Sequence, residues 1–205
     1  LHLSIRRQRQ MCIRDSRIIG RVDNFLTVLV TFFVGVGSLG LYTYISVVLE
    51  RVQVDTIPGM WIWGIGGAVG AFGIGRVLDK VDSSRKLTTI IIVLLAADFV
   101  LLLLFPSSRM VALVCLFAWG LLGWSSMAPQ QHSMLSANPD EGATAVAANA
   151  SANYLGSAVG SAVGGLLLPS STGILLGALF VVLLGIFCSI GARALSFPKP
   201  SDNEN

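Results

Sequence analysis

The sequence predicts an all-α membrane protein built as a bundle of six transmembrane helices. Hydrophobic residues make up 54% of the 205 residues and charged residues only 12%, which is about half the charged fraction of an average soluble domain. Between Arg21 and Arg193 the charges are interrupted by long apolar runs, each near the ~20 residues that a bilayer span needs. Only α-helices and closed barrels satisfy their backbone in lipid, and these runs are too long and continuous for barrel strands, so we expect helices.

The helices are expected, in order, at residues 25–49, 57–78, 87–105, 110–128, 143–168 and 172–195. The first, third and sixth are rich in large aliphatic residues, the second is rich in glycine, the fourth contains "WGLLGWSS", and the fifth consists mostly of small residues. The first is not expected to be a cleaved signal peptide, because its apolar run is about twice the length of an h-region and no A-x-A-like site follows.

Basic residues flank these helices unevenly. The side before the first helix receives eight, namely Arg17, Arg21, Arg76, Lys80, Arg85, Lys86, Arg193 and Lys199. The other side receives two, Arg51 and Arg109. Short cytoplasmic loops carry the excess of Lys and Arg, so we expect a multi-pass inner-membrane protein with both termini in the cytoplasm, a six-helix body at 17–195 and a polar cytoplasmic tail at 196–205.

The first sixteen residues are expected to be foreign to the protein. The stretch "LSIRRQRQMCIRDS" resembles translated sequencing-adaptor read-through, and the alternative is a basic cluster attracted to anionic lipid. Residues 1–16 hold four arginines and one acid, which accounts for the whole formal net charge of +3. The rest of the chain is therefore neutral overall, and we expect no nucleic-acid partner.

Composition also argues against metal and cofactor sites. The three cysteines, Cys12, Cys115 and Cys188, form no CxxC pair, and His2 and His132 are the only histidines. Cysteines inside apolar runs are typical of small buried residues. No metal ion or cofactor is expected.

The second helix ends in a motif, "GIGRVLDKVDSSRKL", with Gly75, Asp79, Lys80 and Arg85 as its defining residues. This G-x-x-x-D-(R/K) pattern, entering a short basic loop, resembles the loop motif of the major facilitator superfamily in the copy between helices 8 and 9. Lys80 replaces the usual Arg, and Asp82 stands where Gly is common. The alternative is a glycine-rich helix end followed by basic residues on the cytoplasmic side.

The order of the other segments extends the resemblance from Arg17 to Leu195. The first helix, ending "LYTYISVVL", resembles helix 7 of drug and sugar efflux members. The fourth and fifth resemble helices 10 and 11 in Trp119-Gly120, Pro129-Gln130 and Asn153-x-x-Gly156.

The resemblance implies the C-terminal half, helices 7–12, of a twelve-helix transporter. Its partners would be the lipid bilayer, a missing N-terminal six-helix half, a small-molecule substrate and protons, with a drug, a sugar or a similar metabolite exported by proton antiport. An uptake symporter of the same fold remains open, as do, more remotely, a non-transporting scaffold and an intramembrane enzyme. An enzyme is not expected, because His132 is the only candidate base and no G-x-S-x-G occurs.

Small residues predict close helix packing. In the fifth helix Gly156, Gly160 and Gly164 recur every four residues, and Gly66 and Gly70 do the same in the second. Asn149 and Asn153 lie on a neighbouring face of the fifth helix. Amides in a membrane helix must pair or face water, so they either bond between helices or line the transport path.

Six further side chains are singled out. Tyr42, Tyr44 and Trp119 are candidates for the transport path by the resemblance, with interfacial anchoring or packing as the alternative. Asp98 is the one acid deep within an apolar run, and lies about 18 Å beyond Lys86, just past the middle of a ~30 Å core. We expect it to be protonated or locally hydrogen-bonded. Trp61 and Trp63 are expected in the interfacial aromatic belt.

Overall fold

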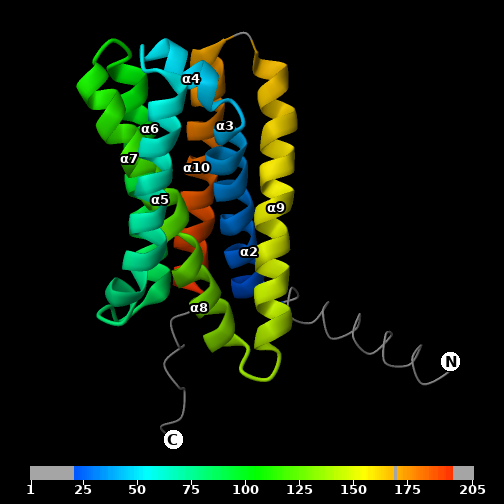
Figure 1. The fold of residues 1–205 in the computed structure, drawn as a ribbon. Helices are drawn as coiled ribbons and strands as arrows, with labels where there is room; N and C mark the ends of the chain where they lie inside the picture. The colour runs from blue at the N-terminus through cyan, green and yellow to red at the C-terminus, as the bar shows by residue number, and fades with distance from the viewer. Residues whose placement is uncertain (1–20, 169, 196–205) are drawn as a thin grey trace, which may run out of the picture.

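The computed structural model describes residues 21–168 and 170–195, and every structural statement below refers to these residues. Its elements are α2 (Val22–Val34), η1 (Gly35–Leu39), α3 (Gly40–Tyr42), α4 (Ile45–Arg51), α5 (Thr56–Leu78), α6 (Ser84–Leu104), α7 (Arg109–Ser125), α8 (Met127–Ala137), α9 (Gly142–Leu167) and α10 (Ser171–Ala194). The long helices lie side by side along one direction (Figure 1). The expectations for residues 1–16 and 196–205 fall outside the described residues.

Five segments are long and apolar enough to cross a membrane, which confirms an all-helical, multi-pass membrane protein. They are Val22–Tyr42, Thr56–Leu78, Ser84–Leu104, Arg109–Ala137 and Ser171–Ala194. The fifth predicted helix, α9, is not among them, because glycine, serine and asparagine lower its hydropathy. It nevertheless runs beside α2 along the bundle (Figure 1). The six-span count therefore stays a prediction.

The first predicted helix, 25–49, is wrong as a single continuous element. The chain changes from α2 to a π-helical stretch at Gly35–Leu39, and breaks again at Thr43 and Tyr44 before α4. Glycines explain the tight approach of other helices here: a Cβ on Gly40 would lie 2.6 Å from the Cα of Gly160. The expected range contains the right residues but not the irregular backbone, because periodicity does not register a π-helical turn.

The fourth predicted helix, 110–128, also differs. The structure ends α7 at Ser125 and continues as α8 to Ala137. Proline causes this break, because the Pro129 ring has no N–H and clashes with the carbonyl of Ser125, four residues earlier. The Ser126 hydroxyl bonds the Gly123 carbonyl at 2.7 Å, and so satisfies a polar group at the break.

Serine caps fix where three helices begin. The hydroxyls of Ser83, Ser108 and Ser170 accept hydrogen bonds from the backbone N–H groups of Lys86, Val111 and Gly173. An N-cap of this kind satisfies one of the free amides of the first turn. The starts of α6, α7 and α10 therefore fall within three residues of the predicted ones.

Side chains are sorted as a bilayer requires. A core that includes Leu95, Phe99, Leu116 and Leu175 is buried, whereas many large apolar residues point outward. Extensive exposed apolar surface is unusual for a soluble monomer and marks a surface for membrane or partner contact. The start of α2 and the end of α10 lie at the same end of the bundle, together with the α5–α6 and α8–α9 connections (Figure 1).

Candidate functional site

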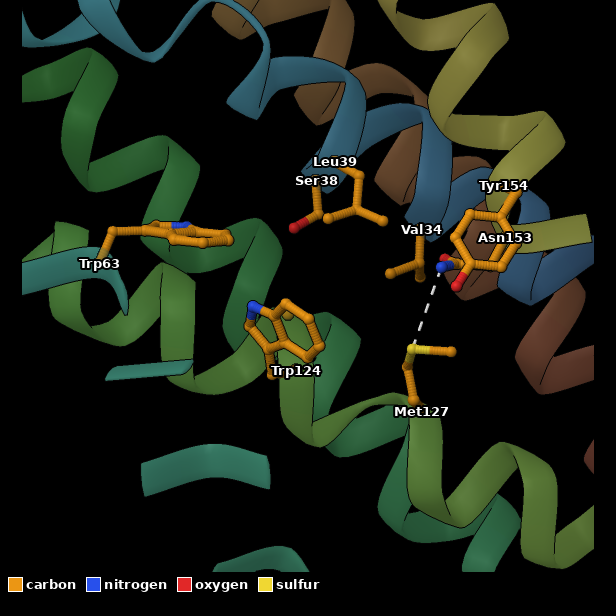
Figure 2. Close-up of a pocket in the computed structure, with 9 residues that line it drawn as sticks. Val34, Ser38, Leu39, Trp63, Trp124, Met127, Asn153 and Tyr154 are labelled. Atoms are coloured by element: carbon orange, nitrogen blue, oxygen red, sulfur yellow. Dashed lines mark hydrogen bonds between the residues drawn. The ribbon is translucent and has the colours of Figure 1, made fainter. Parts of the chain in front are cut away.

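We call residues 22–51, which comprise α2, η1, α3 and α4, the first segment. A pocket of about 110 Å³ lies where the first segment, α5, the α7–α8 break and α9 meet. Its wall is formed by Val34, Ser38, Leu39, Trp63, Gly123, Trp124, Met127, Asn153 and Tyr154 (Figure 2). Four segments distant in the sequence thus contribute to one concave surface. Pockets between bundle helices, mostly apolar with a few polar groups, are typical ligand sites.

The pocket is lined by aromatic and aliphatic groups, and none of its nine lining residues carries a charge. Asn153 supplies the free polar group: its amide nitrogen contacts the Met127 sulfur at 3.9 Å (Figure 2). A thioether is a weak acceptor, so this contact leaves the amide able to bond a ligand. The Ser38 hydroxyl is already engaged, because it accepts a bond from the Trp119 indole.

Trp63 was predicted to be a belt residue, and that assignment is wrong. The residue is 7% exposed, and its ring stacks on Tyr42 with 4.1 Å between centroids and meets the Trp124 ring edge-on at 6.4 Å. Trp61, in contrast, is exposed. The signal was available, since Trp63 lies four residues before Gly67 on the closely packed face of α5.

Trp119 is placed behind the pocket rather than in its wall. It is fully buried, its indole N–H donates to Ser38 at 2.9 Å, and the rings of Phe99 and Trp63 meet it edge-on. Aromatic contacts of this kind hold a core together. Sequence reasoning missed Trp124, Met127 and Tyr154, the residues that reach the pocket from α7, α8 and α9.

The two tyrosines of the first segment do not line this pocket. Tyr42 lies behind Trp63, as its ring contact shows. Tyr44 turns toward α9, where its hydroxyl donates to the Ser161 carbonyl and its ring covers Gly164. The structure brings these two predicted path residues to different surroundings.

The two asparagines of α9 are likewise separated. Asn149 is fully buried and its Oδ1 lies 2.6 Å from the Thr31 hydroxyl, which also contacts Gln130. The Thr31 hydroxyl has one proton and can donate it to only one of the two amide oxygens. Both contacts become hydrogen bonds if the Asn149 amide is turned over, so that its NH₂ group donates to the Thr31 oxygen while Thr31 donates to Gln130. Asn149 therefore joins α9 to α2 and α8, and Asn153 alone faces the pocket.

Glycines let backbones touch at two helix contacts. Along α9 an added Cβ would lie 2.3 Å from the Phe32 carbonyl oxygen at Gly156 and 2.4 Å from the Val36 oxygen at Gly160. On α5, Gly66 and Gly70 face α7 carbonyl oxygens at 2.1 and 2.2 Å in the same way. Contacts below 3 Å leave no room for a methyl group, so both surfaces require glycine.

The loop motif divides into exposed and half-buried members. Nothing in the described residues lies within 4 Å of a Cβ added at Gly75, and Asp79 and Lys80 are exposed. Arg85 instead points inward. Its guanidinium donates to the Ser133 hydroxyl at 2.9 Å, the Ala192 carbonyl at 3.0 Å and the Asp23 carboxylate at 3.2 Å.

Arg85 therefore links α6 to α8, α10 and α2 at the end of the bundle where α2 begins and α10 ends (Figure 1). The guanidinium and Asp23 are both largely shielded, with side chains 15% and 17% exposed. Sequence reasoning missed Asp23 because it stands at the very start of the first apolar run, far from the motif in sequence.

Asp98 is buried between helices rather than at the pocket. It is 5% exposed, the Cys115 thiol of α7 is its hydrogen-bonding neighbour, and its Oδ2 has no partner among the described residues. The described residues also contain no group of three or more His, Cys, Asp and Glu that could hold a metal ion.

Comparison with known proteins agrees with this architecture. A family model described as Major Facilitator Superfamily matches residues 3–161. The chain is also 27% identical over 180 residues to the inner membrane transport protein YdhP of Escherichia coli O157:H7 and of Escherichia coli strain K12. The aligned part covers 84% of this chain and 44% of each relative, so the chain spans less than half the length of the relatives it matches.

The family match starts at residue 3, so it does not separate residues 1–16 from the rest, and their foreign origin stays a prediction. Membership points to a transporter and not to an enzyme. With its all-helical fold and its apolar spans, this chain belongs to the Major Facilitator Superfamily.

Proposed function

We propose that the chain is the C-terminal six-helix half of a secondary transporter, and that the pocket around Asn153 is its share of the transport path. The observation that carries the proposal is the convergence of four segments on one apolar pocket with a single loosely held amide. In transporters of this kind two bundles rock about a site at their interface. The missing half would close the pocket from the side on which Trp124 and Tyr154 are exposed.

In this proposal α9 is the sixth span. Its two amides do not face lipid, because Asn149 bonds within the bundle and Asn153 faces the pocket, and Gly156 and Gly160 contact the first segment. A helix whose polar side is covered needs less overall hydropathy to cross the membrane. With six spans both termini share one side, and the excess of basic residues makes that side the cytoplasm of an inner-membrane protein.

The direction and coupling that we propose are export in exchange for protons, as in the efflux members that the sequence resembles. No lining residue of the pocket is an acid, so this half of the path offers no carboxylate to carry the proton at the substrate site. The carrier would then come from the N-terminal half. An uptake symporter of the same fold is the alternative, and the vesicle assay below distinguishes the two.

Everted membrane vesicles containing the full-length permease test the proposal. A proton gradient, acidic inside, should drive accumulation of a transported compound, and addition of that compound should partly dissipate the gradient. Asn153→Ala should change which compounds act, at an unchanged amount of folded protein. Accumulation driven by the opposite gradient would establish the symporter. Identical transport of every compound by Asn153→Ala would remove the pocket from the path.

A further inference from the structure

A second cavity, of about 270 Å³, lies on the opposite side of the first segment from the substrate pocket. We name it the α9–α10 groove and define it by Gly40, Tyr44, Gly164, Leu167, Gly177 and Phe180 among its lining residues. Its wall is almost entirely hydrocarbon and backbone. The proposed transport path does not use it.

Glycines create the space. A Cβ at Gly164 would lie only 2.4 Å from the Tyr44 ring, so the absence of a side chain there lets the ring pack directly against the backbone of α9. On α10 a Cβ at Gly177 would meet only the flexible end of Leu167, at 2.9 Å. In both places the wall is therefore helix backbone covered by a side chain from a neighbouring element: the Tyr44 ring covers Gly164 of α9, and the movable end of Leu167 covers Gly177 of α10.

The groove opens on the outside of the bundle, because Leu167 and Phe180 in its wall are exposed. In a multi-pass membrane protein this outer surface meets the bilayer. Water is a poor occupant, since a buried water needs two to four polar partners and the Tyr44 hydroxyl is already bonded to Ser161. An apolar chain fits the wall better.

A cation stands at one end of the groove. The Arg51 guanidinium donates to the Thr172 hydroxyl at 2.7 Å, and Thr172 precedes by two residues Ile174 of the groove wall. Arg51 is half-buried and makes no ion pair within residues 21–168 and 170–195. An arginine beside a hydroxyl is well suited to a phosphate group, which arginine binds through paired hydrogen bonds.

We propose that the α9–α10 groove binds one phospholipid, with an acyl chain along the groove and the phosphate on Arg51 and Thr172. The two halves of the site match the two halves of that molecule, and they lie where the end of the bundle meets the membrane surface. The site is independent of the transported substrate and of the direction of transport.

Native mass spectrometry of the delipidated full-length permease tests the proposal with three probes. Dioleoyl phosphatidylglycerol carries both chain and phosphate, dioleoylglycerol lacks the phosphate, and glycerol 3-phosphate lacks the chains. We expect one tightly bound phosphatidylglycerol and no comparable binding of the other two. Arg51→Gln should weaken its binding about tenfold, near the contribution of one charge-assisted hydrogen bond.

Gly177→Leu should also weaken phosphatidylglycerol binding, by filling the groove where only a flexible side chain must move. The matched controls are Arg109→Gln, an exposed arginine at the same end of the bundle, and Gly64→Leu, where a Cβ meets nothing within 4 Å. Both should bind the lipid as the parent does. Parental affinity in both Arg51→Gln and Gly177→Leu would overturn the proposal, and so would equal binding of dioleoylglycerol. Parental affinity in both variants is the result expected if the missing half covers the groove.

Discussion

Replacing Gly160 with alanine should destabilise the protein, although alanine is the better helix former. An added Cβ would lie 2.4 Å from the Val36 carbonyl oxygen and 2.8 Å from the Cα of Gly40, and both are backbone atoms. Ordinary contact would require α9 and the first segment to separate by about 1 Å, and a gap of that size forfeits a quarter to a half of each neighbouring dispersion contact. We expect a loss of ~1–3 kcal/mol from overpacking.

Gly185→Ala is the matched control. Gly185 is also buried in a helix and faces the first segment, but its Cβ would meet Phe33 at an ordinary 3.4 Å. This variant should gain up to ~1 kcal/mol of helix propensity. The two substitutions are chemically identical, so the gain in helix propensity cancels between them, and they should differ in unfolding free energy by the overpacking cost alone, roughly 1–3 kcal/mol.

Equilibrium unfolding of the full-length permease in mixed detergent micelles, followed by tryptophan fluorescence, measures both variants. The reasoning is refuted if Gly160→Ala is as stable as Gly185→Ala. A backbone contact between α9 and the first segment could not then be what demands glycine at position 160.

Three further predictions follow from the other contacts. Arg85→Gln should lower the unfolding free energy by about 1.5–3 kcal/mol, because it breaks charged hydrogen bonds to α2, α8 and α10. In a double-mutant cycle its effect should not add to that of Asp23→Asn, and additive effects would show that the two residues are not coupled. Asp79→Asn should lower transport by the full-length permease at unchanged expression, because we propose that this exposed carboxylate accepts hydrogen bonds from a helix N-terminus of the missing half; parental flux would remove that role. Thr31→Val should destabilise the fold by ~1–3 kcal/mol, since it leaves buried amides of Gln130 and Asn149 without their shared hydroxyl, and an unchanged melting temperature would contradict this.

Most of the fold could be predicted from the lengths of the apolar runs and from the spacing of small residues. Runs near bilayer length predict the helices, and the four-residue spacing from Gly156 to Gly164 picks out the residues that face the first segment. The π-helical stretch at Gly35–Leu39 was not predictable from a local pattern, and its glycines pack against elements far away in the sequence: a Cβ at Gly35 would lie 2.6 Å from the Asn153 carbonyl oxygen of α9, and one at Gly37 2.6 Å from the Val182 side chain of α10. The break before Pro129 was predictable in principle, since proline excludes the carbonyl four residues earlier.

The candidate pocket was predictable only in part. Asn153 and Asn149 are equivalent in spacing, and only the position of Thr31 assigns one to the bundle interior and leaves the other at the pocket. Tryptophans are similarly ambiguous: Trp63 and Trp119 are both buried, but one lines the pocket and the other bonds Ser38 behind it. A large aromatic side chain suits a core, an interface and a ligand wall equally well, so only its neighbours decide between them.

The central claim is that the pocket at Asn153 belongs to an aqueous transport path, and paired cysteine labelling tests it most directly. Tyr154 at the pocket and Phe187 on α10 are almost equally exposed in this half, at 73% and 72%. In the full-length permease without its native cysteines, Tyr154→Cys should react in intact membranes with a small water-soluble thiol reagent, because the pocket admits water. Phe187→Cys should not react, because lipid covers it. Equal reactivity of the two positions, or an inert Tyr154→Cys in every condition of the proton gradient, would contradict the account.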